Sequence, residues 1–167
     1  MHYKKALGWI ECLLLTCVLA TPLMAQGLRG KAELKAGTGP ITIEYGRPSL
    51  KGRDMIGQLK TGDVWRMGQD DPSVLTTPVD LTFGSTKIPK GSYRLQLGKV
   101  AEDKFELIFQ SQSGQAGASQ DLKVPLKKES ASSPVETFTI ELKEAAKGGV
   151  FLTTWGTMRL SADFQIK

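Results

Sequence analysis

Residues 47 to 70 carry the side chains whose types could bind a ligand. Arginine presents a forked donor that matches planar acids, and tryptophan offers a flat apolar face of the kind that stacks on sugar rings. We therefore interpret the stretch as a candidate site for a carbohydrate, a cell-envelope component or a small anionic ligand. The competing interpretation places the tryptophan in the core and leaves the basic residues as solvated loop charges. The candidates are Arg47, Lys51, Arg53, Trp65, Arg66, Gln69 and Asp70.

Three carboxylates, Asp63, Asp70 and Asp71, lie in or beside this stretch. Their oxygens are ligands that calcium accepts, but their spacing is not that of a calcium-binding loop. Aspartate is also frequent in turns, so we predict turns here and no metal site. Together with Glu44 these residues are the acids available to a glycan hydrolase or lyase, which would need two carboxylates placed across one bond.

Several chemistries are excluded by what the chain lacks outside its first 25 residues. The single histidine, His2, and both cysteines, Cys12 and Cys17, lie in that segment. The remainder can form no disulfide, no thiolate or imidazole metal site and no Ser–His or Cys–His dyad. The sequence also has no P-loop, G-x-S-x-G or S-x-x-K motif. We therefore predict no catalytic residues and no cofactor.

The first 25 residues have the pattern of a secretory signal peptide. Two lysines precede an apolar run over residues 6–19, and small residues follow at Ala20 and Ala25, after either of which cleavage is expected. The run is interrupted by Glu11 and is shorter than the roughly 20 apolar residues of a membrane span. An uncleaved N-terminal anchor is the alternative. We expect a periplasmic or secreted protein with no transmembrane segment in the mature chain.

Length and charge indicate the number of domains and the class of partner. Cleavage after Ala25 leaves 142 of the 167 residues, which suits one domain. We expect an N-terminal extension over residues 26–35, with one strand near residues 32–34, and a single domain over residues 36–167. The net charge is +5, but the basic residues form no run or stripe, so we expect no nucleic-acid partner.

Alternation of apolar and polar residues dominates the rest of the chain. One apolar and one polar face per strand is typical of antiparallel sheets with a solvated side. Strands spaced in this way, with glycine- and proline-containing turns between them, predict an all-β fold, an antiparallel β-sandwich of which the jelly roll is one arrangement. The alternating runs cover residues 41–45, 79–83, 93–97, 105–109, 122–126, 138–142 and 158–166.

The connections complete this prediction. Gly84-Ser85 and Gly156-Thr157 suit two-residue turns that begin with glycine, and residues 147–149 suit another hairpin turn. Residues 53–59 place apolar side chains on one side and predict one short helix, which Gly62 would end. Two polar segments, residues 110–120 and 127–134, are predicted to be a flexible loop and a linker.

Four ordered motifs give the chain a resemblance to a known family. They are Arg-Pro-Ser-x-Lys-Gly-Arg at 47–53, Val-Trp-Arg-x-Gly at 64–68, Ile-Pro-x-Gly-x-Tyr at 88–93 and Pro-Val-Glu-Thr-Phe at 134–138. Over residues 36–166 the chain resembles the exported bacterial domain-of-unknown-function family numbered twenty-nine eleven. The resemblance implies an all-β secreted or periplasmic domain without an established activity.

The chain departs from that family's pattern in two places. Members usually carry Gly-Ala-Asn-Glu-like residues where this chain has residues 68–71, Gly-Gln-Asp-Asp. Many also carry a loop with Trp and Tyr where this chain has the Gln, Ser and Gly of residues 110–120. If such a loop lines a pocket in the family, that pocket is altered or absent here.

Three functions therefore stay open. The sequence favours a non-catalytic extracytoplasmic binding module over a structural or assembly role in the cell envelope. A histidine-independent hydrolase or lyase comes third, because a single sequence does not bring its carboxylates together.

Overall fold

The computed structural model describes residues 28–111 and 120–167, and this part of the chain forms ten strands, all paired antiparallel. The predicted signal peptide and most of the predicted loop at 110–120 lie outside the described residues. The strands are β1 (Arg29–Ala36), β2 (Gly39–Gly46), β3 (Val64–Trp65), β4 (Val74–Thr77), β5 (Leu81–Phe83), β6 (Thr86–Ile88), β7 (Gly91–Ala101), β8 (Lys104–Ser111), β9 (Leu122–Ala145) and β10 (Gly148–Ile166).

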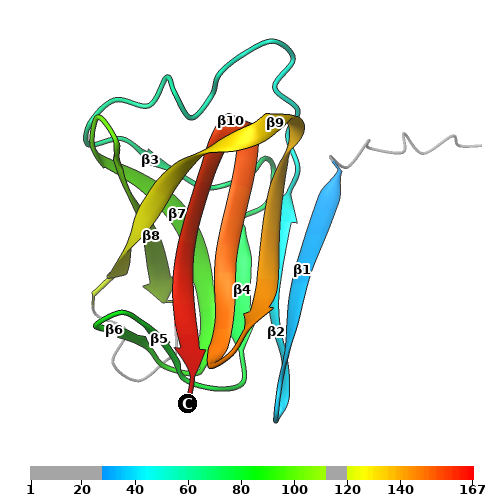
Figure 1. The fold of residues 1–167 in the computed structure, drawn as a ribbon, viewed down its shortest axis with the longest axis vertical. Helices are drawn as coiled ribbons and strands as arrows, with labels where there is room; N and C mark the ends of the chain where they lie inside the picture. The colour runs from blue at the N-terminus through cyan, green and yellow to red at the C-terminus, as the bar shows by residue number, and fades with distance from the viewer. Residues whose placement is uncertain (1–27, 112–119) are drawn as a thin grey trace, which may run out of the picture.

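The strands form two layers, as the alternation predicts (Figure 1). One layer contains β1, β2, β4, β7 and β8, with β3 paired to β7, and the other contains β10, β5 and β6. The all-β antiparallel sandwich is thus confirmed. Strand neighbours are mostly consecutive in the chain, in the order β1-β2-β4-β7-β8-β9-β10-β5-β6. The arrangement is a meander except for the β5–β6 hairpin, which lies between β4 and β7 in the chain but pairs with β10 in the second layer.

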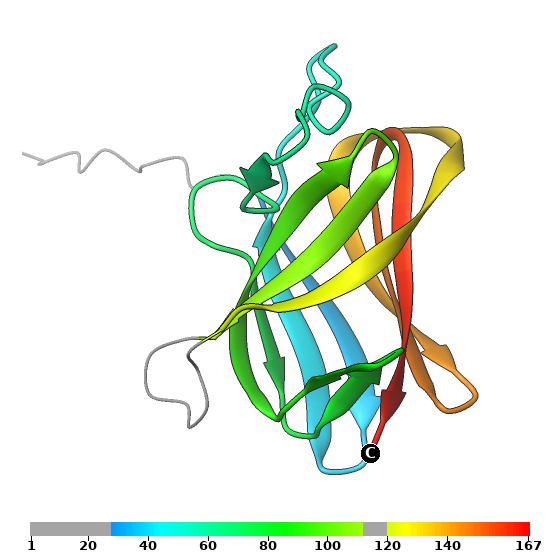
Figure 2. The same ribbon diagram turned by 90° about the vertical axis from the view of Figure 1, so that its left-hand side faces the viewer.

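The long strand β9 belongs to both layers. Residues 122–126 pair with β8, whereas the pairing with β10 begins at Lys127. Figure 2 shows β9 crossing from the side of β7 and β8 to the side of β10. The polar segment 127–134, predicted to be a linker, is therefore part of this strand. Its residues are mostly exposed, so they lack the one-sided apolar pattern that marks a strand in a sequence.

Strand β10 folds back on itself at Gly156, where the sequence predicts a turn. Gly156 has a φ of 61°, a left-handed conformation that glycine adopts without steric cost. The two halves of β10 then run side by side (Figure 1). A Cβ at Gly148 would lie 2.2 Å from the carbonyl oxygen of Phe164, so the start of the strand packs directly on its end.

The predicted helix at residues 53–59 is absent from the described chain, where turns occupy these positions. The Asp54 carboxylate accepts a hydrogen bond from the Gly57 N–H at 2.8 Å, which has the pattern of a helix N-cap, but the segment closes only a turn. So short a segment also cannot offset the cost of helix nucleation. Within the described ranges, no helix has the length and apolar character needed to cross a bilayer.

The expected N-terminal extension is part of the sandwich where it is described. Residues 29–36 pair along their whole length with β2 as the edge strand β1, which includes the strand predicted near residues 32–34. Side chains alternate into the core here as in the other strands, with Ala32 and Leu34 buried. Among the described residues, β1 is thus the first strand of the sandwich.

Candidate functional site

Arg47 is a structural link between the two layers. It follows the last residue of β2 and is half-buried. Its Nε donates to the carbonyl oxygen of Phe138 and its Nη2 to Oγ1 of Thr139, both at 3.3 Å. Both acceptors lie on β9. The guanidinium group thus uses its forked donor, the feature that made it a candidate for binding an anionic ligand, to hydrogen-bond acceptors within the protein.

The residues after Arg47 continue this link through their backbone. The Phe138 N–H donates to the Pro48 carbonyl and the Leu50 N–H donates to the Glu136 carbonyl, each at 2.9 Å. The Lys51 N–H donates to the Glu136 carboxylate at 2.9 Å. The motif at 47–53 therefore lies along the motif at 134–138 like an added strand segment. Their order in the sequence gave no sign of this contact.

Trp65 belongs to an aromatic cluster in the same region. Its ring stacks on Trp155 with centroids 5.3 Å apart and an interplanar angle of 17°. It also meets Phe138 edge-on at 4.9 Å. The Trp155 Nε1 donates to the Glu136 carbonyl at 3.2 Å. Of the two interpretations of Trp65, this packing supports the core residue, which is half-buried at the end of the sandwich.

The other candidates lie on surface loops. Arg66 is exposed and donates to the Asp70 carbonyl at 3.0 Å. Gln69 is half-buried, and its backbone packs so closely on β2 that a Cβ at Gly46 would lie 2.2 Å from its carbonyl oxygen. Lys51 and Arg53 are exposed in the segment that projects from one end of the sandwich (Figure 2).

These seven residues line neither of the two hollows described below. Arg47 and Trp65 hold the fold together, and the solvent-facing residues remain candidates that the structure leaves without a shared cavity. The family motif at 88–93 lies elsewhere: the Tyr93 hydroxyl donates to the Pro89 carbonyl at 2.7 Å, at the end of the sandwich that holds β5 and β6 (Figure 1).

A pocket of about 400 Å³ opens where the layers separate. Along one edge of β10, Ser161 pairs with Lys127 of β9 and Gln165 pairs with Thr82 of β5. The residues between them, 162–164, pair with neither strand. On one side of residues 162–164, β9 crosses to the other layer; on the other side, β5 begins to pair with β10. A wedge-shaped gap therefore remains between β9 and β5. We call this wedge the seam pocket.

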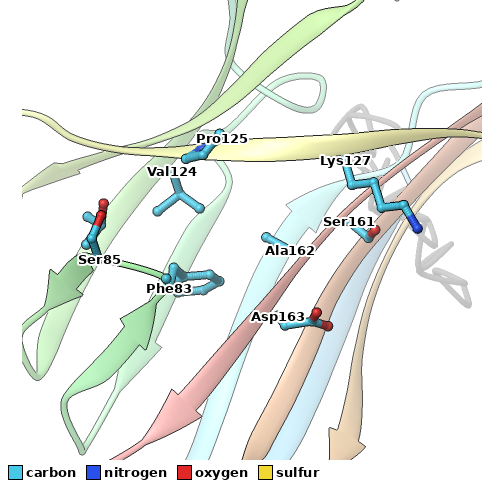
Figure 3. Close-up of a pocket in the computed structure, with 10 residues that line it drawn as sticks. Phe83, Ser85, Val124, Pro125, Lys127, Ser161, Ala162 and Asp163 are labelled. Atoms are coloured by element: carbon cyan, nitrogen blue, oxygen red, sulfur yellow. The ribbon is translucent and has the colours of Figure 1, made fainter.

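The seam pocket has an apolar floor and a polar rim (Figure 3). Phe83, Val124 and Ala162 form the floor, and Phe83 is only 3% exposed. The rim carries hydroxyl groups, one amine and one carboxylate, from Ser85, Thr86, Ser161, Lys127 and Asp163.

The one amine of the rim is neutralised by a carboxylate outside the pocket lining. Lys127 forms an ion pair with Glu129 at 2.6 Å. The hydrogen bond and charge of Glu129 raise the pKa of Lys127, with a smaller effect from Asp163, and the same pair lowers the pKa of Glu129. The amine therefore stays protonated and already has a carboxylate partner. The pocket carries no uncompensated positive charge that would select an anion.

The seam pocket has few titratable side chains in its lining. Asp163 is the one carboxylate in its lining, so the pocket holds no pair of acids of the kind that glycoside cleavage needs. No group of three or more His, Cys, Asp or Glu side chains gathers anywhere in residues 28–111 and 120–167. An apolar floor with a few polar groups at the rim is the usual make-up of a ligand site.

Sequence reasoning missed this pocket for a physical reason. Alternation correctly predicts that Phe83 and Val124 point inward, but the cavity arises because β9 changes layers. That change occurs at Lys127, where the polar segment 127–134 begins, and this segment has no alternating pattern that would predict a strand.

Comparison with known proteins agrees with the motifs. No curated protein and no solved structure shows a significant match to the chain. A family model described as "Protein of unknown function (DUF2911)" matches residues 29–164, a range that runs from the first residue of β1 almost to the end of β10. The chain therefore belongs to this family of proteins of unknown function.

Proposed function

We propose that the chain is a non-catalytic, extracytoplasmic module that binds a neutral carbohydrate in the seam pocket. The make-up of that pocket carries the proposal: an aromatic and aliphatic floor, a rim of hydroxyl groups, and a single amine that is already paired with Glu129. Sugar rings have the complementary surface, with apolar C–H faces and hydroxyl groups around the edge. The volume of about 400 Å³ lies within the usual range of small-molecule sites.

Two observations favour this ligand over the small anion that the arginines suggest. Arg47 donates to acceptors on β9, and the amine of the seam pocket is paired with Glu129. A neutral ligand would instead use Ser85, Ser161 and Asp163 as hydrogen-bonding groups. Carboxylates suit this task, since a charged acceptor strengthens its hydrogen bonds to hydroxyl groups.

Titration calorimetry with neutral and acidic oligosaccharide panels tests the proposal. We expect the neutral panel alone to contain a ligand, and Asp163→Asn to weaken its binding by about tenfold, the loss typical of one charge-assisted hydrogen bond. Glu102→Gln, on the exposed turn between β7 and β8, is the matched control and should bind as the parent does. Equal binding by the two variants, or a response confined to acidic sugars, would refute the assignment.

Export is the second part of the proposal and rests on the pattern of the first 25 residues. Mass spectrometry of the protein recovered from its native host should find a mature N-terminus at Thr21 or Gln26. Recovery of the intact chain in the cytoplasm would refute it.

A further inference from the structure

A second hollow adjoins the seam pocket on the outer surface of the same layer. It has a volume of about 440 Å³ and lies between β5, the end of β10 and the β9–β10 hairpin. Its lining includes Gly84 and Asp163, which also line the seam pocket. We call this hollow the hairpin groove.

Small residues keep the hairpin groove open. Ala145, Ala146, Gly148 and Gly149 form the side contributed by the hairpin. At Gly148 a side chain is excluded by packing, because its Cβ would lie 2.2 Å from the Phe164 carbonyl oxygen. A Cβ at Gly149 would likewise lie 2.6 Å from the Leu34 and Phe164 side chains, so packing requires both glycines and thereby leaves the hairpin side of the groove without bulky side chains.

The polar groups of the groove suit a hydroxyl-rich ligand. Thr82 and Gln165 are directly paired across β5 and β10, so their side chains lie next to each other on the outer face. The Thr82 Oγ1 is shut off from solvent and has no hydrogen-bond partner among the described residues. Unsatisfied buried hydroxyls are rare in folded proteins. Thr82 is among the residues that line the groove, so we expect a bound ligand to supply the missing partner after a change of rotamer.

We infer that the seam pocket and the hairpin groove form two adjoining subsites for one linear, neutral oligosaccharide that passes Asp163. The inference rests on the proposed function and adds to it the length of the ligand. One sugar would occupy the seam pocket, and the next residues of the same chain would extend toward Thr82 and Gln165. The carboxylate of Asp163 lies where both hollows meet and can accept hydrogen bonds from either sugar.

Thr82→Val alters the hairpin groove without altering the lining of the seam pocket, and we expect the variant to fold. Valine has nearly the shape of threonine, and the change removes a hydroxyl that has no partner, so we expect the free protein to unfold at the same or a slightly higher temperature. Thr76→Val is the matched control, since Thr76 is exposed on β4 in the other layer.

Affinities should be measured for one neutral oligosaccharide series, from the monosaccharide to the hexasaccharide, by titration calorimetry. In the parent protein we expect affinity to rise from the mono- to the trisaccharide. Thr82→Val should leave the monosaccharide unchanged and weaken the trisaccharide by about five- to tenfold, the loss of one hydrogen bond. The Thr76→Val control should match the parent throughout.

The two failures are distinguishable. Affinity that is independent of chain length, or a trisaccharide affinity unchanged by Thr82→Val, would overturn the second subsite and leave the proposed function standing. If no member of any neutral series binds the parent protein, both are overturned.

Discussion

Replacing Arg47 by alanine tests whether this residue binds a ligand or holds the fold. The substitution removes two hydrogen bonds to β9, from Nε to the Phe138 carbonyl and from Nη2 to Thr139 Oγ1. Hydrogen bonds from a charged group contribute about 1.5–3 kcal/mol each. Both bonds here are long, at 3.3 Å, so the lower value applies to each. We expect Arg47→Ala to lower the free energy of unfolding by about 3 kcal/mol.

Urea unfolding followed by tryptophan fluorescence is a direct assay, because Trp65 and Trp155 stack in the same region. Arg53→Ala is the matched control. Arg53 is exposed, and surface substitutions of this kind change stability by less than about 0.5 kcal/mol. Arg47→Lys should fall between the two, since lysine keeps the charge but lacks the fork that reaches two acceptors.

The outcome separates the two roles cleanly. If Arg47→Ala is as stable as Arg53→Ala, the contacts to β9 contribute nothing and the structural role is refuted. A ligand would then be the better explanation for an arginine at this position. The urea dependence of the unfolding free energy should stay the same across the set, so that midpoints can be compared directly.

Two further predictions concern packing and pH. Gly46→Ala should destabilise the protein by at least about 2 kcal/mol, because its Cβ would lie 2.2 Å from the Gln69 carbonyl oxygen; a urea midpoint equal to that of the parent would contradict this. The side chain of Lys87 and the backbone N–H of Lys90 hydrogen-bond Asp80 and lower the pKa of its carboxyl group. A lowered folded-state pKa gives stability that is complete above the unfolded value of about 4 and is lost as the pH falls through the folded value. Asp80→Asn should therefore flatten the decline of the urea midpoint below about pH 4, and pH profiles that coincide with the parent's would argue against the effect.

The fold could be predicted to a large extent because burial leaves a two-residue period in the sequence. Residues 41–45 and 93–97 alternate between buried and more exposed side chains in the structure, as their pattern indicates. The period fails where a strand is exposed on both faces. Residues 127–130 extend β9 through pairing with β10, and residues 131–134 follow as an irregular part of the same strand. Hydrogen bonds between strands place no demand on side-chain type.

The candidate site was harder to predict because side-chain type does not specify a partner. Arg47 has the chemistry of an anion-binding residue, but its donors face β9. Conversely, Ser85, Ser161 and Ala162 are ordinary strand and turn residues in the sequence. They line a pocket only because β9 and β5 leave a gap along β10. A cavity that forms because two strands diverge is not indicated by the local sequence of either strand.

Gly30 leaves space for two side chains that link the first layer to the second. It lies opposite Tyr45 in the β1–β2 ladder, and a Cβ there would meet the Tyr45 ring and the Arg47 side chain at 2.7 Å. Because glycine leaves this space free, both side chains pass over β1 to β9, where the Tyr45 hydroxyl donates to the Ile140 carbonyl at 3.1 Å. The partners are 91 to 95 positions apart in the chain.

This separation has a consequence for the order of folding. Contacts between distant positions require the closure of a long loop and therefore form slowly. During synthesis from the N-terminus the β1–β2 hairpin can form early. The hydrogen bonds of Tyr45 and Arg47 to β9 can form only after the chain has been synthesised as far as residue 140. Until then the second layer does not cover the inner face of the first layer. The partly folded domain therefore depends on a short delay between the synthesis of the two layers.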